Sequence, residues 1–397
     1  MRVIFFVQKL FCLFILITIL IIIHINMKRT VQIEFFKVWK KSFNANTTKY
    51  ILLWTSPQTV PFSDMGEGQT GFIKRNCPHV NCYVTGNRTY LGDIKRFDVI
   101  VFAAPQLIGI INKDLPTERS LRQKYVFASI ESPENYPLLS YKLNNYFNWT
   151  WTYKLDSEVR WGYIVIRDSK GNIIGPKKEM HWIKLQDMDP VSKDLEKRIK
   201  SKKKAAAWFV SNCFSASRRE EVAKEIKIDL MKNYHVLDIY GNCGLFSCSK
   251  DKADECNKMI EDKYYFYLSF ENSLSEDYVT EKLLIAVQYN IVPVVFGGAN
   301  YSRFLPDGSY LDARKLGVPK LVEKMIELIK NPKKYLEYFR WKNHYSYHKT
   351  SESVETNEYC KMCSLLNDDD MMRRNSIYDD LQTWWNEPDF KSNVVYV

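Results

Sequence analysis

The sequence lacks the glycine-rich signatures of the common phosphate-binding folds. No GxxxxGK[ST] motif occurs in its 397 residues, and neither of the two strand–helix–strand units described below carries a GxGxxG fingerprint. These absences argue against a P-loop kinase and against a dinucleotide-dependent oxidoreductase. The N-terminal hydrophobic run is not followed by a small-residue cleavage site, which argues against a removed signal peptide.

Cysteine pairs with metal-ligand spacing are also scarce. Cys360-x-x-Cys363 has no second CxxC beside it, so a disulfide that ties down the C-terminal segment is favoured over a zinc site or a redox pair. Apart from Cys12 in the hydrophobic run, the cysteines are even in number, as an oxidising compartment allows. The sequence leaves their pairing open. The candidate disulfide cysteines are Cys77, Cys82, Cys213, Cys243, Cys248, Cys256, Cys360 and Cys363.

The N-terminal region predicts a retained membrane anchor. Residues 10–25 are apolar apart from Thr18 and His24, and residues 3–7 extend the run to spanning length. We expect a cytoplasmic tail at 1–9, a transmembrane helix at 10–26 and a stem at 27–49. The flanking lysines and arginines do not favour a cytoplasmic N-terminus, yet we expect the folded region in the lumen. Glycosylation sequons, which also arise by chance, stand at Asn46, Asn87, Asn148 and Asn300.

The remaining chain is too long for a single core and suggests two domains. Its net charge is +11, and basic residues concentrate in residues 177–204. Residues 193–204 are most simply a solvated connector. Because an anchor and disulfides argue against nucleic-acid binding, the positive charge fits an anionic small substrate or nearby anionic lipid better.

The most informative segment begins at Tyr264. Residues 264–270 predict a buried strand, a helix is expected from about Tyr278, and residues 291–296 predict the second strand of a βαβ unit. Lys282 is a cation near the start of that helix, where the macrodipole favours carboxylates. It is either a lysine on a solvated face or the partner of an anion, such as a phosphate at the helix end.

A second segment repeats this arrangement. Residues 205–211 and 235–240 predict strands, and Ser217-Arg-Arg-Glu220 fits a capping box that opens the helix between them. Arg218 and Arg219 fall in its first turn. Two such units predict a doubly wound sheet, whose ligands bind beyond the carboxyl ends of the strands. A nucleoside diphosphate held by arginine and lysine is the simplest ligand.

The N-terminal half predicts another sheet. Strands are expected at 50–54, 97–102 and 124–129, and Glu131 follows the third of them, so its carboxylate would face an interdomain cleft. The tail beyond residue 358 carries an acidic run and is expected at the surface. The expected regions are an acceptor-side domain at 50–170, a linker with one helix at 171–204, a nucleotide-binding domain at 205–355 and a tail at 356–397.

Several ordered blocks between about Tyr50 and Trp385 resemble the α1,3-fucosyltransferase family. These are Golgi type II membrane enzymes with two facing Rossmann-like domains and a cleft between them, the GT-B architecture. The most specific blocks are Phe270-Glu-Asn-Ser, Asp277-Tyr-Val-Thr-Glu-Lys282, Val292-Pro-Val-Val-Phe-Gly297 and Phe304-Leu-Pro-Asp-Gly-Ser309. Supporting blocks are Glu131-Ser-Pro133, Phe147-Asn-Trp-Thr150, Tyr153-Lys-Leu-Asp-Ser157, Val210-Ser-Asn212 with Arg219, and Asp238-Ile-Tyr-Gly241.

The resemblance implies a role for each matching residue. Lys282 and Arg219 fall where the family contacts the diphosphate of GDP-fucose, and Glu281 falls where a carboxylate binds the ribose. Tyr278 would line the nucleotide pocket, and Glu131 matches the proposed general base. Each also has a plainer interpretation, such as capping a turn or pairing on the surface. The implied donor-binding residues are Arg219, Tyr240, Glu271, Asn272, Tyr278, Glu281 and Lys282.

The resemblance also implies a reaction. L-Fucose would move from GDP-fucose to the 3-hydroxyl of GlcNAc in glycoprotein glycans, with inversion in one in-line displacement. Cations and helix N-termini would stabilise the departing diphosphate, so no cofactor is strictly required, and stimulation by Mn²⁺ or Mg²⁺ is compatible. The implied partners are the donor, a glycoprotein acceptor and the membrane of the Golgi cisternae, without nucleic acid.

The acceptor and two rival functions stay open. Arg160-Trp-Gly-Tyr163 replaces the family's Pro-Tyr-Gly, while residues 241–244 favour the GlcNAc of an N-glycan core over an antennal one. Asp187-Met-Asp189 is the DxD of metal-dependent glycosyltransferases that use other nucleotide sugars. An aromatic content of 14% also suits a membrane-anchored lectin. His344 and His348 have the spacing of a metal pair, but no third ligand is identifiable.

Overall fold

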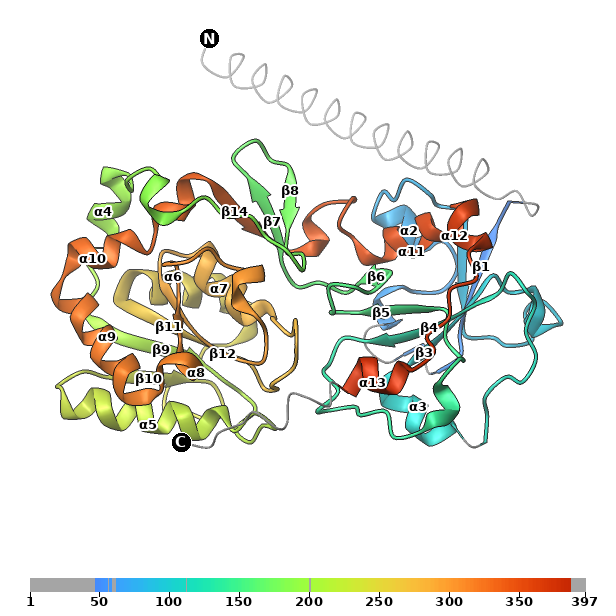
Figure 1. Cartoon of the computed structure of the whole chain (residues 1–397), viewed down its shortest axis with the longest axis horizontal. Helices are drawn as coiled ribbons and strands as arrows, with labels where there is room; N and C mark the ends of the chain where they lie inside the picture. The colour runs from blue at the N-terminus through green and yellow to red at the C-terminus, as the bar shows by residue number, and fades with distance from the viewer. Residues whose placement is uncertain (1–46, 56, 59–61, 112, 200, 387–397) are drawn as a thin grey trace, which may run out of the picture.

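The structure is a computed structural model that describes residues 47–55, 57–58, 62–111, 113–199 and 201–386. The expected anchor at 10–26, the tail before it, nearly all of the stem, Cys12 and Asn46 lie outside the described residues. Within the described ranges, no helix has both the length and the apolar character needed to cross a membrane. The described chain forms two lobes that lie side by side (Figure 1).

The N-terminal lobe is built on a six-stranded parallel sheet in the order β2-β1-β3-β4-β5-β6. Its central strands are buried on both faces, which is why they read as continuous apolar runs. The sheet confirms the three expected strands and adds three that were not predicted. The strands are β1 (Lys49–Leu53), β2 (Cys82–Thr85), β3 (Val99–Ala103), β4 (Lys124–Ser129), β5 (Trp149–Thr152) and β6 (Val159–Arg160). The helices are η1 (Phe62–Asp64), α2 (Thr70–Lys74), η2 (Ile94–Arg96), α3 (Ala104–Ile110) and η3 (Tyr141–Leu143).

The C-terminal segment completes this lobe. The sequence predicted that this segment lies at the surface, but part of it is buried in the lobe. Its helices α11 (Glu358–Leu366), α12 (Asp369–Arg373) and α13 (Leu381–Asn386) lie against the N-terminal lobe in Figure 1. Met362 and Leu366 of α11 join the core on one face of the sheet, and Leu381 and Trp385 of α13 join the core on the other. The acidic run at 368–370 is exposed, as expected.

All eight candidate cysteines form disulfides. Two of these bonds tie α11 to the N-terminal lobe, and the other two lie within the C-terminal lobe. The CxxC cysteines therefore bond to distant partners and not to each other. The pairs are Cys77–Cys360, Cys82–Cys363, Cys213–Cys243 and Cys248–Cys256.

The C-terminal lobe is built on a five-stranded parallel sheet in the order β10-β9-β11-β12-β13. Helices α5 and α9 bury their apolar residues on one face of this sheet, and α6 packs on the other. The strands are β9 (Lys204–Phe209), β10 (Leu237–Tyr240), β11 (Tyr264–Phe270), β12 (Val292–Phe296) and β13 (Leu311–Asp312). The helices are α5 (Arg219–Lys232), η5 (Lys250–Lys252), α6 (Ala253–Lys263), α7 (Glu281–Gln288), η6 (Tyr301–Arg303), α8 (Ala313–Leu316), α9 (Val318–Lys330), α10 (Pro332–Glu337) and η7 (Arg340–Asn343).

The connection between the lobes is more structured than the predicted linker with one helix. The hairpin of β7 (Val165–Asp168) and β8 (Ile173–Gly175) pairs antiparallel with β14 (Tyr345–His348), which precedes η8 (Thr350–Glu352). Thus the outgoing and returning chains share one small sheet. The rest of the connection holds η4 (Leu185–Asp187) and α4 (Lys193–Ile199). Ile199 and Lys202 are buried, so the solvated connector predicted at 193–204 is wrong for these residues.

Two α/β lobes, each with a parallel sheet, agree with the expected GT-B-like fold. The loops beyond β4 and β11 come from different lobes and contact each other through Glu131 and Tyr278. The carboxyl ends of the two sheets therefore meet, and the residues that the sequence singled out lie at this meeting point.

Candidate functional site

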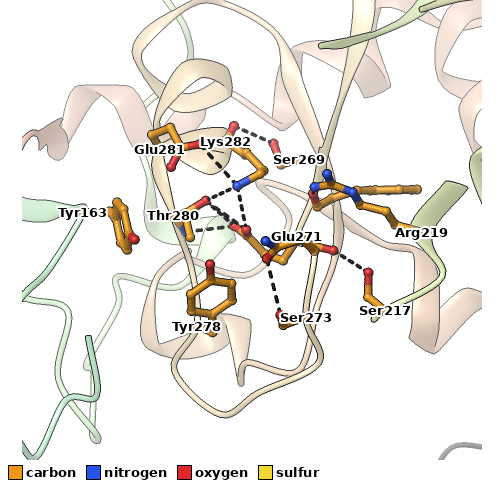
Figure 2. Close-up of polar contacts among 12 residues, drawn as sticks. Tyr163, Ser217, Arg219, Ser269, Glu271, Ser273, Tyr278, Thr280, Glu281 and Lys282 are labelled. Atoms are coloured by element: carbon orange, nitrogen blue, oxygen red, sulfur yellow. Dashed lines mark hydrogen bonds and ion pairs between the residues drawn. The ribbon is translucent and has the colours of Figure 1, made fainter. Parts of the chain in front are cut away.

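A buried carboxylate lies at the centre of the site. Glu271 follows β11 directly and is almost fully buried. Its carboxylate accepts hydrogen bonds from the Thr280 backbone N–H at 2.8 Å and from the Thr280 hydroxyl, and the Lys282 ammonium lies 3.2 Å away (Figure 2). Burial raises the pKa of Glu271, and the charge of Lys282 opposes that rise. A buried charge is tolerable when it is paired and hydrogen-bonded in this way.

Lys282 lies between two carboxylates. Its ammonium group contacts Glu271 and Glu281 at 3.2 Å each and donates a hydrogen bond to the Thr280 hydroxyl at 2.7 Å. Burial alone would lower the pKa of Lys282, but the two carboxylates raise it above its ordinary value, so the amine stays charged. The Glu281 side chain is 60% exposed. Of these two partners, Glu281 can therefore turn toward a ligand while Glu271 stays in place.

Arg219 brings a second cation to the same region. Its side chain is 4% exposed, and it donates hydrogen bonds to the carbonyl oxygens of Phe270 at 2.7 Å and Asn212 at 3.3 Å. No carboxylate of the described residues forms an ion pair with it, and its buried Nε has no hydrogen-bond partner there. Burial lowers the pKa of this guanidinium. An unpaired buried donor costs about 1–3 kcal/mol, and an anionic ligand would remove that cost.

The helix starts differ from the sequence predictions. Helix α7 begins at Glu281 and not near Tyr278, since Thr280 is still extended and serves as its N-cap residue. The capping box predicted at Ser217 is wrong: Arg218 holds the cap position in a left-handed conformation without a capping hydrogen bond, and the Ser217 hydroxyl donates to the Glu271 carbonyl instead. Both cations consequently sit within the first two residues of their helices.

Glu131 faces this region from the N-terminal lobe. One of its carboxylate oxygens accepts a hydrogen bond from the Tyr278 hydroxyl at 2.8 Å and from the Asn135 amide at 3.1 Å. The Tyr278 ring is buried and meets Tyr153 edge to face at 4.8 Å. Tyr163, whose hydroxyl donates to the Ile130 carbonyl, holds the backbone beside Glu131. The structure therefore brings Glu131 and Tyr278 together although they belong to different lobes.

The other predicted donor residues lie less centrally. The backbone carbonyl of Asn272 accepts from the Ser217 N–H, which ties together the loops that precede α5 and α7. The Tyr240 hydroxyl meets Tyr264 at 2.8 Å, in a group with Asp238, and makes no hydrogen bond to the residues around Glu271. Sequence reasoning missed Thr280 and Ser217 as contact residues, although hydroxyl side chains just before two helices were a usable signal.

A GxGxxG spacing does occur outside the two βαβ units, at residues 66–71. It follows η1 and not a strand, so it lacks the context of a dinucleotide fingerprint. Its glycines have a backbone explanation: Gly66 and Gly68 have positive φ, and a Cβ on Gly71 would lie 2.1 Å from the Met65 carbonyl oxygen. These glycines serve the turn and not a phosphate.

The remaining sequence candidates are placed as follows. Among the described residues, no group of three or more histidine, cysteine or acidic side chains is arranged to hold a metal ion. Asp189 lies 3.7 Å from His344, whereas His348 contacts Glu352. Asn87 and Asn300 are exposed. Asn148 is buried, and its amide oxygen and nitrogen are both engaged in hydrogen bonds, so the folded protein does not present it for glycosylation.

Comparison with known proteins gives consistent results. Residues 199–384 match the model of the C-terminal part of glycosyltransferase family 10 (fucosyltransferase), and residues 46–164 match the model of the fucosyltransferase N-terminal part. The chain is 34% identical over 348 residues to alpha-(1,3)-fucosyltransferase C of Drosophila melanogaster, covering 85% of this chain and 78% of that protein.

Two further similarities are more distant. The chain is 29% identical over 328 residues to glycoprotein 3-alpha-L-fucosyltransferase A of Drosophila melanogaster, covering 81% of this chain and 58% of that protein. A crystal structure of an alpha1,3-fucosyltransferase with GDP-fucose aligns with a TM-score of 0.49 and 14% identity, covering 84% of this chain and 93% of that chain.

Proposed function

Because the chain belongs to glycosyltransferase family 10, the fucosyltransferases, we propose that it moves L-fucose from GDP-fucose to the 3-hydroxyl of GlcNAc in glycoprotein glycans. It is an α1,3-fucosyltransferase, and the transfer inverts the anomeric centre. One observation carries the proposal: buried Arg219 and partly buried Lys282 lie at the starts of α5 and α7, opposite a carboxylate of the other lobe.

The donor binds through its diphosphate. Among the described residues, Arg219 bonds to two carbonyl oxygens, lies against the Trp208 ring and keeps one unpaired buried N–H, so no carboxylate competes with phosphate oxygens for its charge. Lys282 is already paired with Glu271, and its part is to present a fixed ammonium group at the start of α7. Glu281 turns from Lys282 to the ribose hydroxyls. The Glu271 and Asn272 loop supports both cations, and Tyr278 closes the side next to Glu131.

The transfer is a single displacement. The acceptor 3-hydroxyl gives its proton to Glu131 while the hydroxyl oxygen forms the new bond to fucose C1. The bond from C1 to the phosphate oxygen breaks on the opposite face, and its electron pair leaves with GDP. Negative charge then grows on the diphosphate, where Arg219, Lys282 and the positive ends of two helices stabilise it.

This arrangement does not require a metal ion, because the protein's own cations face the leaving group. We propose that Mn²⁺ or Mg²⁺ can increase the rate of the reaction but is not required for it. Activity that survives EDTA in an Asp187→Asn/Asp189→Asn variant supports this proposal, whereas complete loss with EDTA contradicts it.

We place the enzyme in the membrane of the Golgi cisternae as a single-pass type II protein with its catalytic region in the lumen. The four disulfides support an oxidising compartment. The acceptor we propose is the GlcNAc of an N-glycan core, on the strength of residues 241–244. Protease protection in sealed Golgi vesicles tests the topology, and linkage analysis of products from a glycan panel tests the acceptor.

One experiment tests the central claim. GDP binding is measured by calorimetry, and fucose transfer is measured with GDP-fucose, for the wild type, Arg219→Met and the neighbouring Arg218→Met. We expect Arg219→Met to lower kcat/KM about 100-fold or more. Arg218 is exposed and pairs with Glu221, so its loss should leave both measurements near wild type. A folded wild type that binds neither GDP nor GDP-fucose would refute the proposal.

A further inference from the structure

The loop between β11 and α7 has one unusual residue that the proposed reaction does not use. In the described chain five non-glycine residues have positive φ, and four of them are exposed. The fifth is Asp277, with φ of 60° and a side chain that is 0% exposed. Most non-glycine residues pay about 1–2 kcal/mol for a left-handed conformation, which aspartate and asparagine tolerate better, but a buried carboxylate is costly whatever its backbone. Strong contacts must therefore hold Asp277 in this state.

The contacts of Asp277 come from three separate segments. One carboxylate oxygen lies 2.7 Å from the guanidinium of Arg303 in η6 of the C-terminal lobe. The other lies 2.9 Å from the ammonium of Lys178, in the segment that joins the lobes, and accepts from the Leu155 backbone N–H, which follows β5 of the N-terminal lobe, at 3.2 Å. Asp277 therefore fastens its loop to both lobes and to the connection between them.

Residues 271–280, here named the interlobe loop, are fixed at other points as well. The Leu274 N–H donates to Glu134 of the N-terminal lobe at 2.8 Å. Beneath the loop, a Cβ on Gly298 would lie 2.4 Å from the Ser275 nitrogen, so the backbones approach closely there. Half-buried Glu276 pairs with the same two cations as Asp277, through Lys178 and Arg303.

The next residue after Asp277 is Tyr278, whose hydroxyl holds Glu131. We propose that Asp277 is a positioning residue for fucose transfer, which fixes the interlobe loop so that Tyr278 keeps Glu131 aimed at the donor site. This inference rests on the proposed function, because Glu131 has a defined task only in that reaction. Lys282 depends on Asp277 less, since Glu271, Thr280 and the bond from Ser269 to its carbonyl hold it within the C-terminal lobe.

The role predicts a split between donor binding and turnover. Asparagine tolerates the left-handed conformation and is nearly isosteric, but it removes the charge that pairs with Lys178 and Arg303. In the full chain, Asp277→Asn should lower kcat about 10- to 100-fold, the range expected when a reacting group is misplaced by about 1 Å. The affinity and stoichiometry of GDP binding by calorimetry should stay within about threefold of wild type. The matched control Glu276→Gln should keep kcat within about threefold.

The outcomes separate this inference from the function on which it rests. If wild type transfers fucose and Asp277→Asn has the same kcat, the positioning role is wrong. A fall in activity that merely tracks a fall in GDP-binding stoichiometry also overturns it, because that result reports partial unfolding. If wild type transfers no fucose, the proposed function itself fails. Should Asp277→Asn not fold, Lys178→Met decides: a loss of kcat of more than about threefold at unchanged GDP affinity supports the role, and a kcat within about threefold of wild type overturns it.

Discussion

The two lobes share a parallel sheet but hold their reactive groups by contacts of different range. In the C-terminal lobe, Glu271 is bonded by Thr280, nine residues away, and the disulfides span 30 and 8 residues. In the N-terminal lobe, Glu131 is held by Tyr278, 147 residues away, and the disulfides span 283 and 281 residues. The donor site is therefore built within its own lobe, whereas the base and its lobe also depend on distant parts of the chain.

Removing the long-range disulfides should give the largest effect. In the chain-entropy relation, closing a loop of 283 residues stabilises by about 5.6 kcal/mol. The second bond is offset from the first by about five residues at one end and about three at the other, so it closes only a short further loop and adds about 2.5 kcal/mol. We expect a variant with Cys77, Cys82, Cys360 and Cys363 all changed to alanine to lose about 8 kcal/mol, most of a typical domain's stability. Loss of only one of these pairs should cost about 2.5 kcal/mol, because the other keeps the long loop closed.

The matched control is the local pair Cys248–Cys256, whose removal should cost about 2.5 kcal/mol. Urea unfolding followed by tryptophan fluorescence measures all three variants. Equal losses for the four-alanine variant and the local pair would contradict the contrast between the lobes.

The next effect separates the two lobes by function. Glu131→Gln should lower kcat about 10²- to 10⁴-fold, the usual range for loss of a general base. GDP affinity should be unchanged, because the donor site belongs to the other lobe. Steady-state kinetics and GDP calorimetry check both statements, with exposed Glu118→Gln as the control. A Glu131→Gln variant that turns over like wild type, or that no longer binds GDP, would break the division of roles.

A third change tests the local pair in the C-terminal lobe. Lys282→Met alone leaves Glu271 buried without its cation, which should cost about 3–5 kcal/mol of stability as well as activity. The double variant Glu271→Gln/Lys282→Met should recover most of the stability, yet remain about 100-fold slower than wild type. Thermal unfolding and transfer assays on both variants distinguish the two contributions. Recovery of full activity in the double variant would show that Lys282 has no role beyond pairing.

The smallest effect concerns pH. Lys202 is buried at the start of the C-terminal lobe and donates to the carbonyls of Glu261 and Tyr264, and burial lowers its pKa to about 7. An unfolded lysine titrates near pH 10.4, so between pH 7 and 10 the unfolded state binds more protons and this group makes stability rise with pH. From pH 7 to 8 the gain is about 1 kcal/mol. Lys202→Met should remove this rise in the free energy of unfolding, measured by urea unfolding at pH 7 and pH 8. If the variant shows the same rise between the two pH values as wild type, Lys202 is not its source.

The difference in contact range also explains what the sequence could predict. Strands β11 and β12 and the cations at the starts of α5 and α7 followed from apolar runs and nearby charges. Strand β5 was missed because its Trp-Thr-Trp-Thr run lacks aliphatic residues, although all four residues are buried. The helix-start errors arose because Ser217 and Tyr278 use their hydroxyls on Glu271 and Glu131, contacts that no local pattern contains. The pairing of β14 with β7 and the disulfide between Cys360 and Cys77 also join segments that are far apart in the sequence, so no local pattern predicts them.

The disulfides between α11 and the N-terminal lobe have a consequence for biosynthesis. Translation delivers the strands of that lobe first, but Cys77 and Cys82 must wait as thiols until Cys360 and Cys363 emerge, nearly three hundred residues later. The half of the enzyme that is made earliest is thus the last to mature. Until then its sheet lacks a covering helix on each face, so nascent chains should engage lumenal chaperones and oxidoreductases through this lobe and not through the self-contained other one.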